Sequence, residues 1–128
     1  MRLTAEMLEQ AEACQYQLDL FRERFPEGVV PTEALCLQNQ DFDYEWAAQL
    51  LSPEKQKRFW DIVGQARIEY AGVIATARAT YEAAIPAEAT YKATNAAAGA
   101  MYAAAVAPAL AAYQAAKAAA FGRLWEEP

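Results

Sequence analysis

Apolar residues recur at spacings of three and four along the first 25 residues, which is the pattern of an amphipathic helix. The apolar positions are Met7, Ala11, Cys14, Leu18, Phe21 and Phe25. Thr4 is a suitable N-cap, and the Pro26 to Gly28 segment provides a stop. The sequence therefore predicts one helix from about residue 5 to residue 25, with Cys14 on its apolar face.

Two shorter helices are predicted before residue 52. Thr32 can cap a helix that runs through Leu35 to about Gln40, and Asp41 or Asp43 can cap the next one. The second of these carries Trp46, Ala47, Leu50 and Leu51 as its apolar residues. Together with the first helix they form a predicted three-helix head, residues 1–51.

The second part of the chain, residues 52–128, reads as helix almost throughout. Ser52, Pro53 and Glu54 combine a capping hydroxyl, a proline at the first helical position and an acid in the first turn. Pro86 and Pro108 interrupt the pattern, and each costs about 3 kcal/mol inside a helix. Poor turn chemistry around both prolines favours one long kinked helix to about residue 124. A fold-back near Pro86 or within residues 95–99 is the alternative.

Five tyrosines mark one face of this segment. Tyr70, Tyr81, Tyr91, Tyr102 and Tyr113 recur every ten or eleven residues and fall within an arc of roughly 80° on a helical wheel. An eleven-residue (hendecad) repeat keeps such a stripe on one side of a long helix. The stripe predicts packing in a core or against a partner, and we select Tyr81, Tyr91, Tyr102 and Tyr113 as candidate interface residues. The opposite, small-residue face, which includes Thr76 and Gly122, is a second possible interface.

The predicted fold class is all-α. A short three-helix head precedes a long, proline-kinked, Ala/Tyr-rich helix that is either coiled-coil-like or folded back as a bundle. Larger apolar residues share the tyrosine side of the wheel and are expected to face the core: Val73, Ile74, Ile85, Val106, Leu110, Phe121 and Leu124.

Charge is distributed unevenly over the 128 residues. Of the net charge of −6, residues 1–51 contribute −7 and residues 52–128 contribute +1. An acidic head argues against nucleic acid as a partner, because phosphate recognition needs clustered lysine and arginine. It permits a basic protein partner.

One acidic segment stands beside aromatic residues. Asp41, Asp43 and Glu45 alternate with Phe42, Tyr44 and Trp46. Helix capping and solvation explain the segment in part, and docking on a basic protein is the other interpretation. We therefore add Asp41, Asp43 and Glu45 to the candidate protein-interface residues.

The chain is poorly equipped for catalysis. It has no histidine and a single serine, Ser52, which helix capping already explains. Cys14 and Cys36 form no CxxC pair, so we expect free thiols, with a disulfide between them as the alternative. We expect no metal, no cofactor and no enzymatic activity.

Residues 93–116 carry no charge and are long enough to span a bilayer. They are mostly alanine and contain few of the residues that favour transfer into lipid, so we do not expect membrane insertion. Acids at residues 6, 9 and 12 also interrupt any leader-like apolar run. The expected location is the cytoplasm.

Several segments together resemble a family of small bacterial and prophage proteins. The similar segments are Ala13-Cys14 to Gln17, Phe21, Phe25-Pro26, residues 32–36, residues 46–51 and the ending, residues 118–125. Members have a similar head and an Ala/Tyr-repeat tail, and some carry an immunity-protein label. The resemblance implies a bacterial or phage setting and supplies no functional residue.

We therefore expect a non-enzymatic protein-binding factor that inhibits or neutralises a host enzyme, toxin or defence complex. The alternative is a structural rod that self-associates through its tyrosine stripe, as a homo-oligomer.

Overall fold

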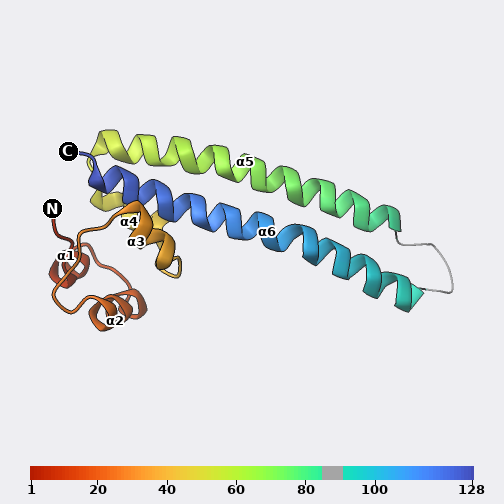
Figure 1. Ribbon diagram of the computed structural model, residues 1–128, viewed down its shortest axis with the longest axis horizontal. Helices are drawn as coiled ribbons and strands as arrows, with labels where there is room; N and C mark the ends of the chain where they lie inside the picture. The colour runs from red at the N-terminus through yellow and green to blue at the C-terminus, as the bar shows by residue number, and fades with distance from the viewer. Residues whose placement is uncertain (85–90) are drawn as a thin grey trace. The chain divides into compact units, whose positions relative to one another are not determined.

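The computed structural model describes residues 1–84 and 91–128, apart from the side chains of residues 91–95. Its elements are all helical (Figure 1). In chain order they are α1 (Ala5–Gln10), α2 (Gln15–Arg24), α3 (Glu33–Gln38), α4 (Tyr44–Ala47), the short 3₁₀ helix η1 (Ala48–Leu50), α5 (Pro53–Ala84) and α6 (Tyr91–Glu126). The predicted all-α fold class is confirmed.

Contacts between Cα atoms divide the chain into two units. The head unit comprises residues 1–61 and 117–128, and the hairpin unit comprises residues 62–116. α5 and α6 therefore each contribute to both units. The head that we predict from composition, residues 1–51, lies within the head unit, which also takes in the first turns of α5 and the last turns of α6.

The helix predicted over residues 5–25 is in fact two helices, and the prediction was wrong on this point. Glu12 adopts a left-handed conformation with φ of 63°. The Ala13 amide donates to the Leu8 carbonyl at 2.9 Å, and the Glu12 amide donates to the Glu9 carbonyl at 3.0 Å. These two bonds define a Schellman motif that ends α1. Glycine is the usual residue at this position, so a glutamate gave no stop signal.

The predicted N-caps are confirmed. The Thr4 side chain accepts from the Met7 amide, and the Thr32 side chain accepts from the Leu35 amide at 3.1 Å. Asp43 caps α4, and the Ser52 hydroxyl lies 3.4 Å from an amide in the first turn of α5. Each of these residues satisfies an amide that the helix itself leaves unpaired.

The core of the head unit joins both ends of the chain. Phe59, Phe121 and Leu124 are among its fully buried side chains, and they come from the start of α5 and the end of α6. The Phe121 ring lies 5.5 Å from the Tyr44 ring, and the Trp125 indole donates to the Met1 carbonyl at 2.8 Å. The C-terminal segment is therefore an integral part of the head core.

Gly122 allows a close approach between α6 and the start of α3. A Cβ atom at this position would lie 2.4 Å from the Thr32 carbonyl oxygen and 2.7 Å from the Glu33 amide nitrogen. Only glycine fits this space without movement of the backbone. The small-residue face that we predict as a possible interface is, at Gly122, a contact within the chain.

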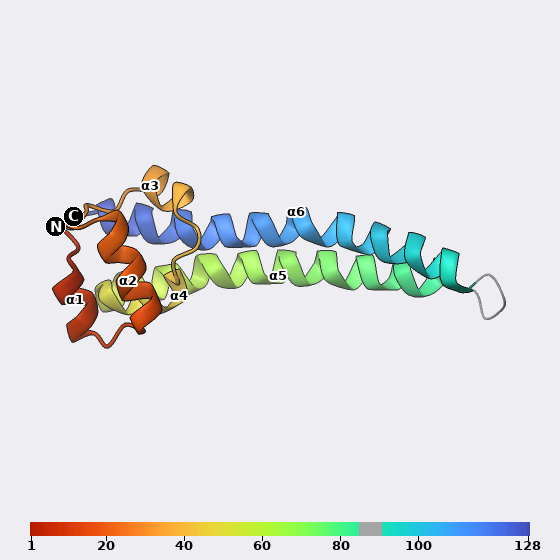
Figure 2. The same ribbon diagram turned by 90° about the horizontal axis from the view of Figure 1, so that it is seen from below.

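In the hairpin unit α5 and α6 run antiparallel, side by side in both views (Figures 1 and 2). The Tyr70 ring stacks on Tyr113 with centroids 5.3 Å apart, and the Tyr81 ring meets Tyr102 edge-on at 6.0 Å. These residues can pair only if the chain folds back between them. The favoured prediction of one continuous helix was therefore wrong, and the alternative, a fold-back, is what the structure has. Helix α6 continues through Pro108, whereas Pro86 lies outside the described residues.

Candidate functional site

The acidic segment at the start of α4 is held by contacts within the head unit. Both carboxylate oxygens of Asp41 accept from the Arg24 guanidinium, at 2.6 and 2.5 Å. This bidentate pair holds the pKa of Asp41 below its usual value and raises the pKa of Arg24. The same guanidinium lies over the Phe42 ring, 5.4 Å from its centre.

The other two candidate acids also have partners. The Asp43 carboxylate caps α4 by accepting from the Trp46 amide at 3.0 Å, while the Asp43 amide donates to the Gln17 side chain at 3.0 Å. Glu45 lies 3.8 Å from the Lys117 ammonium. The three acids lie on one segment, and each already contacts another group of the head unit. For Asp43 this contact is the helix cap, which supports the capping interpretation.

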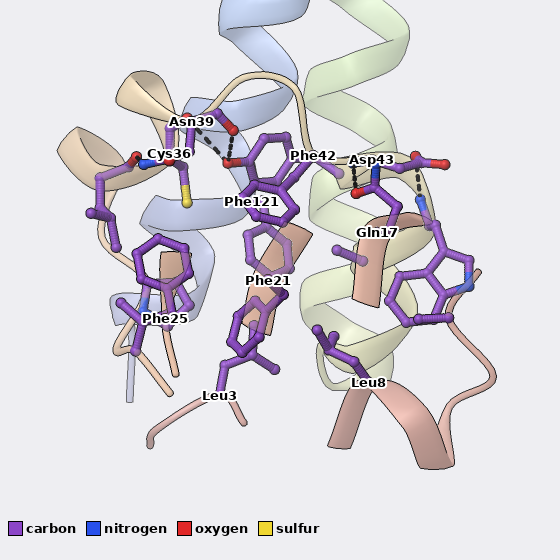
Figure 3. Close-up of a pocket in the computed structure, with 17 residues that line it drawn as sticks. Leu3, Leu8, Gln17, Phe21, Phe25, Cys36, Asn39, Phe42, Asp43 and Phe121 are labelled. Atoms are coloured by element: carbon purple, nitrogen blue, oxygen red, sulfur yellow. Dashed lines mark hydrogen bonds between the residues drawn. The ribbon is translucent and has the colours of Figure 1, made fainter. Parts of the chain in front are cut away.

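Beneath this segment lies an apolar cavity of about 60 Å³ in the head unit (Figure 3). The rings of Phe21, Phe25 and Phe42 form a cluster on one side, with centroids 5.4 to 6.3 Å apart. Leu3, Leu8, Cys36 and Phe121 also line it. Small-molecule sites are commonly ~300–1,000 Å³. This cavity is therefore a small gap in core packing and is too small for a cofactor.

Two ionisable groups face this core, and both are held in their neutral forms. The Tyr44 hydroxyl donates to the Asn39 carbonyl at 2.6 Å, and burial raises its pKa well above the usual value. Burial also raises the pKa of the Cys36 thiol to about 11. At neutral pH neither group is an anion, so neither is activated as a nucleophile or a base.

The two cysteines are not joined by a disulfide, as we expect from the sequence. Cys36 is buried, but Cys14 is exposed at the start of α2, so its predicted place on an apolar face was wrong. The difference follows from the break at Glu12, which takes Cys14 out of the first helix. Among the described residues no group of three or more His, Cys, Asp or Glu side chains could hold a metal ion.

The candidate tyrosines of the hairpin unit contact one another. Tyr81 packs against Tyr102, and Tyr113 stacks on Tyr70. The Arg67 guanidinium donates to the Tyr113 hydroxyl at 3.2 Å. The side chain of Tyr91 lies outside the described residues. The stripe predicted from the sequence is therefore, where described, the line along which α5 and α6 meet.

An open groove of about 660 Å³ runs along the hairpin unit. Its walls come from both helices: Glu69, Gly72, Val73, Thr76, Ala77, Thr80, Tyr81 and Ala84 of α5, and Ala98, Met101, Tyr102 and Ala105 of α6. Val73 and Met101 are its exposed large apolar side chains, at 39% and 59%. Val73 is predicted to face the core, and this prediction was wrong because the side chain is exposed. No sequence pattern points to Met101. Thr76, on the predicted small-residue face, does line the groove.

Among the described residues, one helical segment is long and apolar enough to cross a membrane. This segment is Ala96–Glu126, with a mean hydropathy of 1.4 over its most apolar window, of which 6% is buried. A single helix of this kind is weak evidence for a membrane segment.

Comparisons of the chain with family models, with curated proteins and with solved structures find no match. The resemblance described from the sequence therefore stays a prediction. Its segments map onto one part of the fold, since the head positions and the 118–125 ending all lie in the head unit.

Proposed function

We propose that this chain is a non-enzymatic protein-binding factor whose head unit recognises a basic surface on another protein. The observation that carries the proposal is the division of charge between the two units. The head unit has fourteen acidic and eight basic side chains, a net charge of −6, whereas the hairpin unit has three of each and is neutral. A field of this kind steers a basic partner toward the head unit.

The exposed acids of α1 and α2, and of the residues next to these helices, are the best candidates for this recognition. Arg22 is paired with Glu9, and Arg24 is paired with Asp41, so both arginines of this region already contact acids. Glu6, Glu12 and Glu23 are exposed beside them, as are Asp19 and Glu27. Tyr16, on the same helix as Glu23, is 69% exposed and supplies apolar area. In this proposal the predicted Asp41, Asp43 and Glu45 contribute charge to the surface.

The two buried ionisable groups of the head core offer no activated nucleophile or base. Cys36 and Tyr44 are neutral at physiological pH, and the cavity that they face is too small for a cofactor. In the bacterial or phage setting that the resemblance implies, such a factor would act in the cytoplasm, where it would block a host enzyme, toxin or defence complex.

The second candidate, self-association of the tail through its tyrosine stripe, has less support. Tyr70 and Tyr113, and likewise Tyr81 and Tyr102, already pair within one chain and are half-buried there. Less of each ring is therefore available for contact with a second copy.

The test is capture from a bacterial lysate with the full chain as bait. We expect a basic protein in stoichiometric amount, released by about 0.5 M salt because exposed charges are screened. A variant with Glu6→Gln, Glu12→Gln, Asp19→Asn and Glu23→Gln should lose the partner. The matched control, Glu69→Gln with Glu82→Gln in the hairpin unit, should retain it. Failure to retain any stoichiometric partner, or retention that neither salt nor the head variant changes, would contradict the proposal.

A further inference from the structure

The α3 segment, residues 32–43, is weakly anchored in the head unit. Helix α3 itself has six residues, and Cys36 is the one buried residue of the whole segment. A helix of this length is not stable in water by itself, so α3 depends on its contacts with the rest of the head unit. Regions that bury little apolar area are the ones that open most readily in folded proteins.

The end of α6 holds the beginning of α3. The Arg123 guanidinium donates to both carboxylate oxygens of Glu33, at 3.2 and 3.0 Å, and the Glu126 carboxylate accepts from the Glu33 amide at 3.1 Å. Gly122 lets the two backbones approach, because a Cβ atom there would meet the Thr32 carbonyl. The three polar contacts lie at the surface, where solvent screens them and their contribution to stability is small.

Tyr44 holds the other end of α3. Its hydroxyl donates to the Asn39 carbonyl at 2.6 Å and lies 3.1 Å from the Cys36 carbonyl oxygen. Both carbonyls belong to the last turn of α3, where a helix leaves its own acceptors unpaired. The Tyr44 ring packs on Phe121 of α6, with centroids 5.5 Å apart. The end of α6 therefore supports α3 at both of its ends.

The α3 segment covers one side of the apolar cavity of the head unit (Figure 3). Five of its residues line that cavity: Leu35, Cys36, Asn39, Phe42 and Asp43. The Phe42 ring lies 6.3 Å from the ring of Phe21, which belongs to α2 and is buried. Displacement of the segment would therefore open the cavity to solvent.

Most contacts that such a displacement breaks are polar and exposed. They include the pairs of Arg123 with Glu33 and of Arg24 with Asp41, whose groups water can solvate when they separate. The apolar cost is limited to Cys36 and to half-buried side chains such as Phe42. By contrast, α2 buries both Leu18 and Phe21 and has more to lose by leaving the core.

We propose that the α3 segment is a lid over the head cavity, which opens as a local unit while α2, α5 and α6 stay folded. The end of α6 is the seat on which the lid closes. Opening exposes Cys36 and the phenylalanine cluster to solvent and separates Asp41 from Arg24. This motion goes beyond the proposed protein-binding role, which does not require the lid to move.

The Cys36 thiol provides the test. In the full chain with Cys14→Ser it is the single thiol, and a closed lid shields it. Its rate of reaction with an aromatic disulfide reagent therefore measures the population of the open lid. We expect a rate roughly 100-fold or more below that of the urea-unfolded chain. The rate should rise with urea less steeply than global unfolding does, because a local opening exposes little surface.

Variants at the two ends of α3 should favour the open lid. Tyr44→Phe removes the hydroxyl and keeps the ring, and we expect labelling of Cys36 about ten-fold faster. Arg123→Gln with Glu126→Gln should speed it about three-fold or more. The matched control, Arg22→Gln with Glu9→Gln, removes an ion pair between α1 and α2 and should change the rate less than about two-fold.

Hydrogen exchange of the α2 amides separates lid opening from unfolding of the head unit. These amides should keep their rates in every variant, and circular dichroism verifies that helix content is retained. If Tyr44→Phe does not fold, the exposed Arg123/Glu126 variant still supplies the comparison.

Three results would overturn the proposal. The first is a Cys36 rate that equals that of the unfolded chain or follows the full urea dependence of global unfolding. The second is an end variant that leaves the rate unchanged, or a control that raises it equally. The third is an end variant that speeds α2 exchange as much as Cys36 labelling. None of these measurements involves a partner protein, so their outcome is independent of the capture experiment.

Discussion

The same two helices behave differently in the two units of this protein. Where α5 and α6 belong to the head unit, they contribute Phe59, Phe121 and Leu124 to a closed core. Where they form the hairpin unit, the side chains that they bury among the described residues are Val63, Ala77 and Ala98, and an open groove remains. The buried apolar area per residue, and hence the hydrophobic stabilisation, depends on side-chain size. Helix formation alone therefore does not close a core, and the head unit should hold most of the stability of the single chain.

Replacing Phe121 by alanine should have the largest effect on stability. The side chain is fully buried against Tyr44 and Trp125, so its loss leaves a cavity at the junction of both chain ends. We expect a loss of about 3–5 kcal/mol. The matched hairpin change, Tyr81→Ala, should cost less than half as much, because that ring is half-buried. Urea unfolding measures both, and equal losses would break the comparison.

Adding one methyl group should have opposite effects in the two units. Gly122→Ala forces a Cβ atom against the Thr32 carbonyl oxygen, and we expect a loss of about 1–3 kcal/mol. Gly64→Ala meets no atom within 4 Å in α5, so higher helix propensity should raise the stability by about 0.5–1 kcal/mol. Thermal unfolding reports both shifts. A neutral Gly122→Ala would mean that α6 does not approach α3 closely.

A glycine at residue 12 should stabilise the head unit. Glu12 has φ of 63°, a conformation that costs a residue with a Cβ atom and does not cost glycine. We expect Glu12→Gly to raise the free energy of unfolding by about 0.5–1 kcal/mol. The control, Glu6→Gly inside α1, should lower it by a similar amount. If both changes are destabilising, the Schellman motif that separates α1 from α2 is not formed.

Acid should weaken the head unit through three ion pairs. Arg123 lowers the pKa of Glu33, Arg24 lowers that of Asp41, and Arg58 lowers that of Glu127. Because each folded-state pKa lies below its unfolded value, the stabilisation is present at neutral pH. It is lost as the pH falls from about 4.5 through the folded pKa values.

We expect the urea midpoint to fall modestly over this range, since the groups are exposed and screened. The triple variant Glu33→Gln, Asp41→Asn and Glu127→Gln should show a flatter pH profile. An unchanged profile would show that these pairs do not form in solution.

Local chemistry explains why much of the fold could be predicted from the sequence. Thr4, Thr32, Asp43 and Ser52 act as caps on the helices that follow them, and a cap depends only on the next three residues. The end of α1 was missed because the left-handed position holds Glu12 in place of glycine. The starts of the helices were therefore predicted correctly, whereas the break between α1 and α2 was not.

The fold-back could not be predicted reliably, because it depends on contacts between residues far apart in the sequence. A single helical wheel over residues 53–124 treats α5 and α6 as one helix with one buried face. In the structure they are two helices, and each has its own face toward the other. The predicted stripe is correct for Tyr81 and Tyr102, which pack against each other. It is wrong for Val73 and Leu110, which are predicted to face the core and are exposed. Met101 gave no signal among its alanine neighbours, and only the pairing of the two helices makes it line the same groove as Val73.

Hydrogen exchange of the full chain tests most directly the contrast between a closed head core and a sparsely packed hairpin unit. Amides of α2 and of residues 118–126 should exchange slowly, because they open only with the head core. Amides of residues 69–84 and 98–105 should exchange at least ten-fold faster. Equal protection of the two units would contradict this contrast.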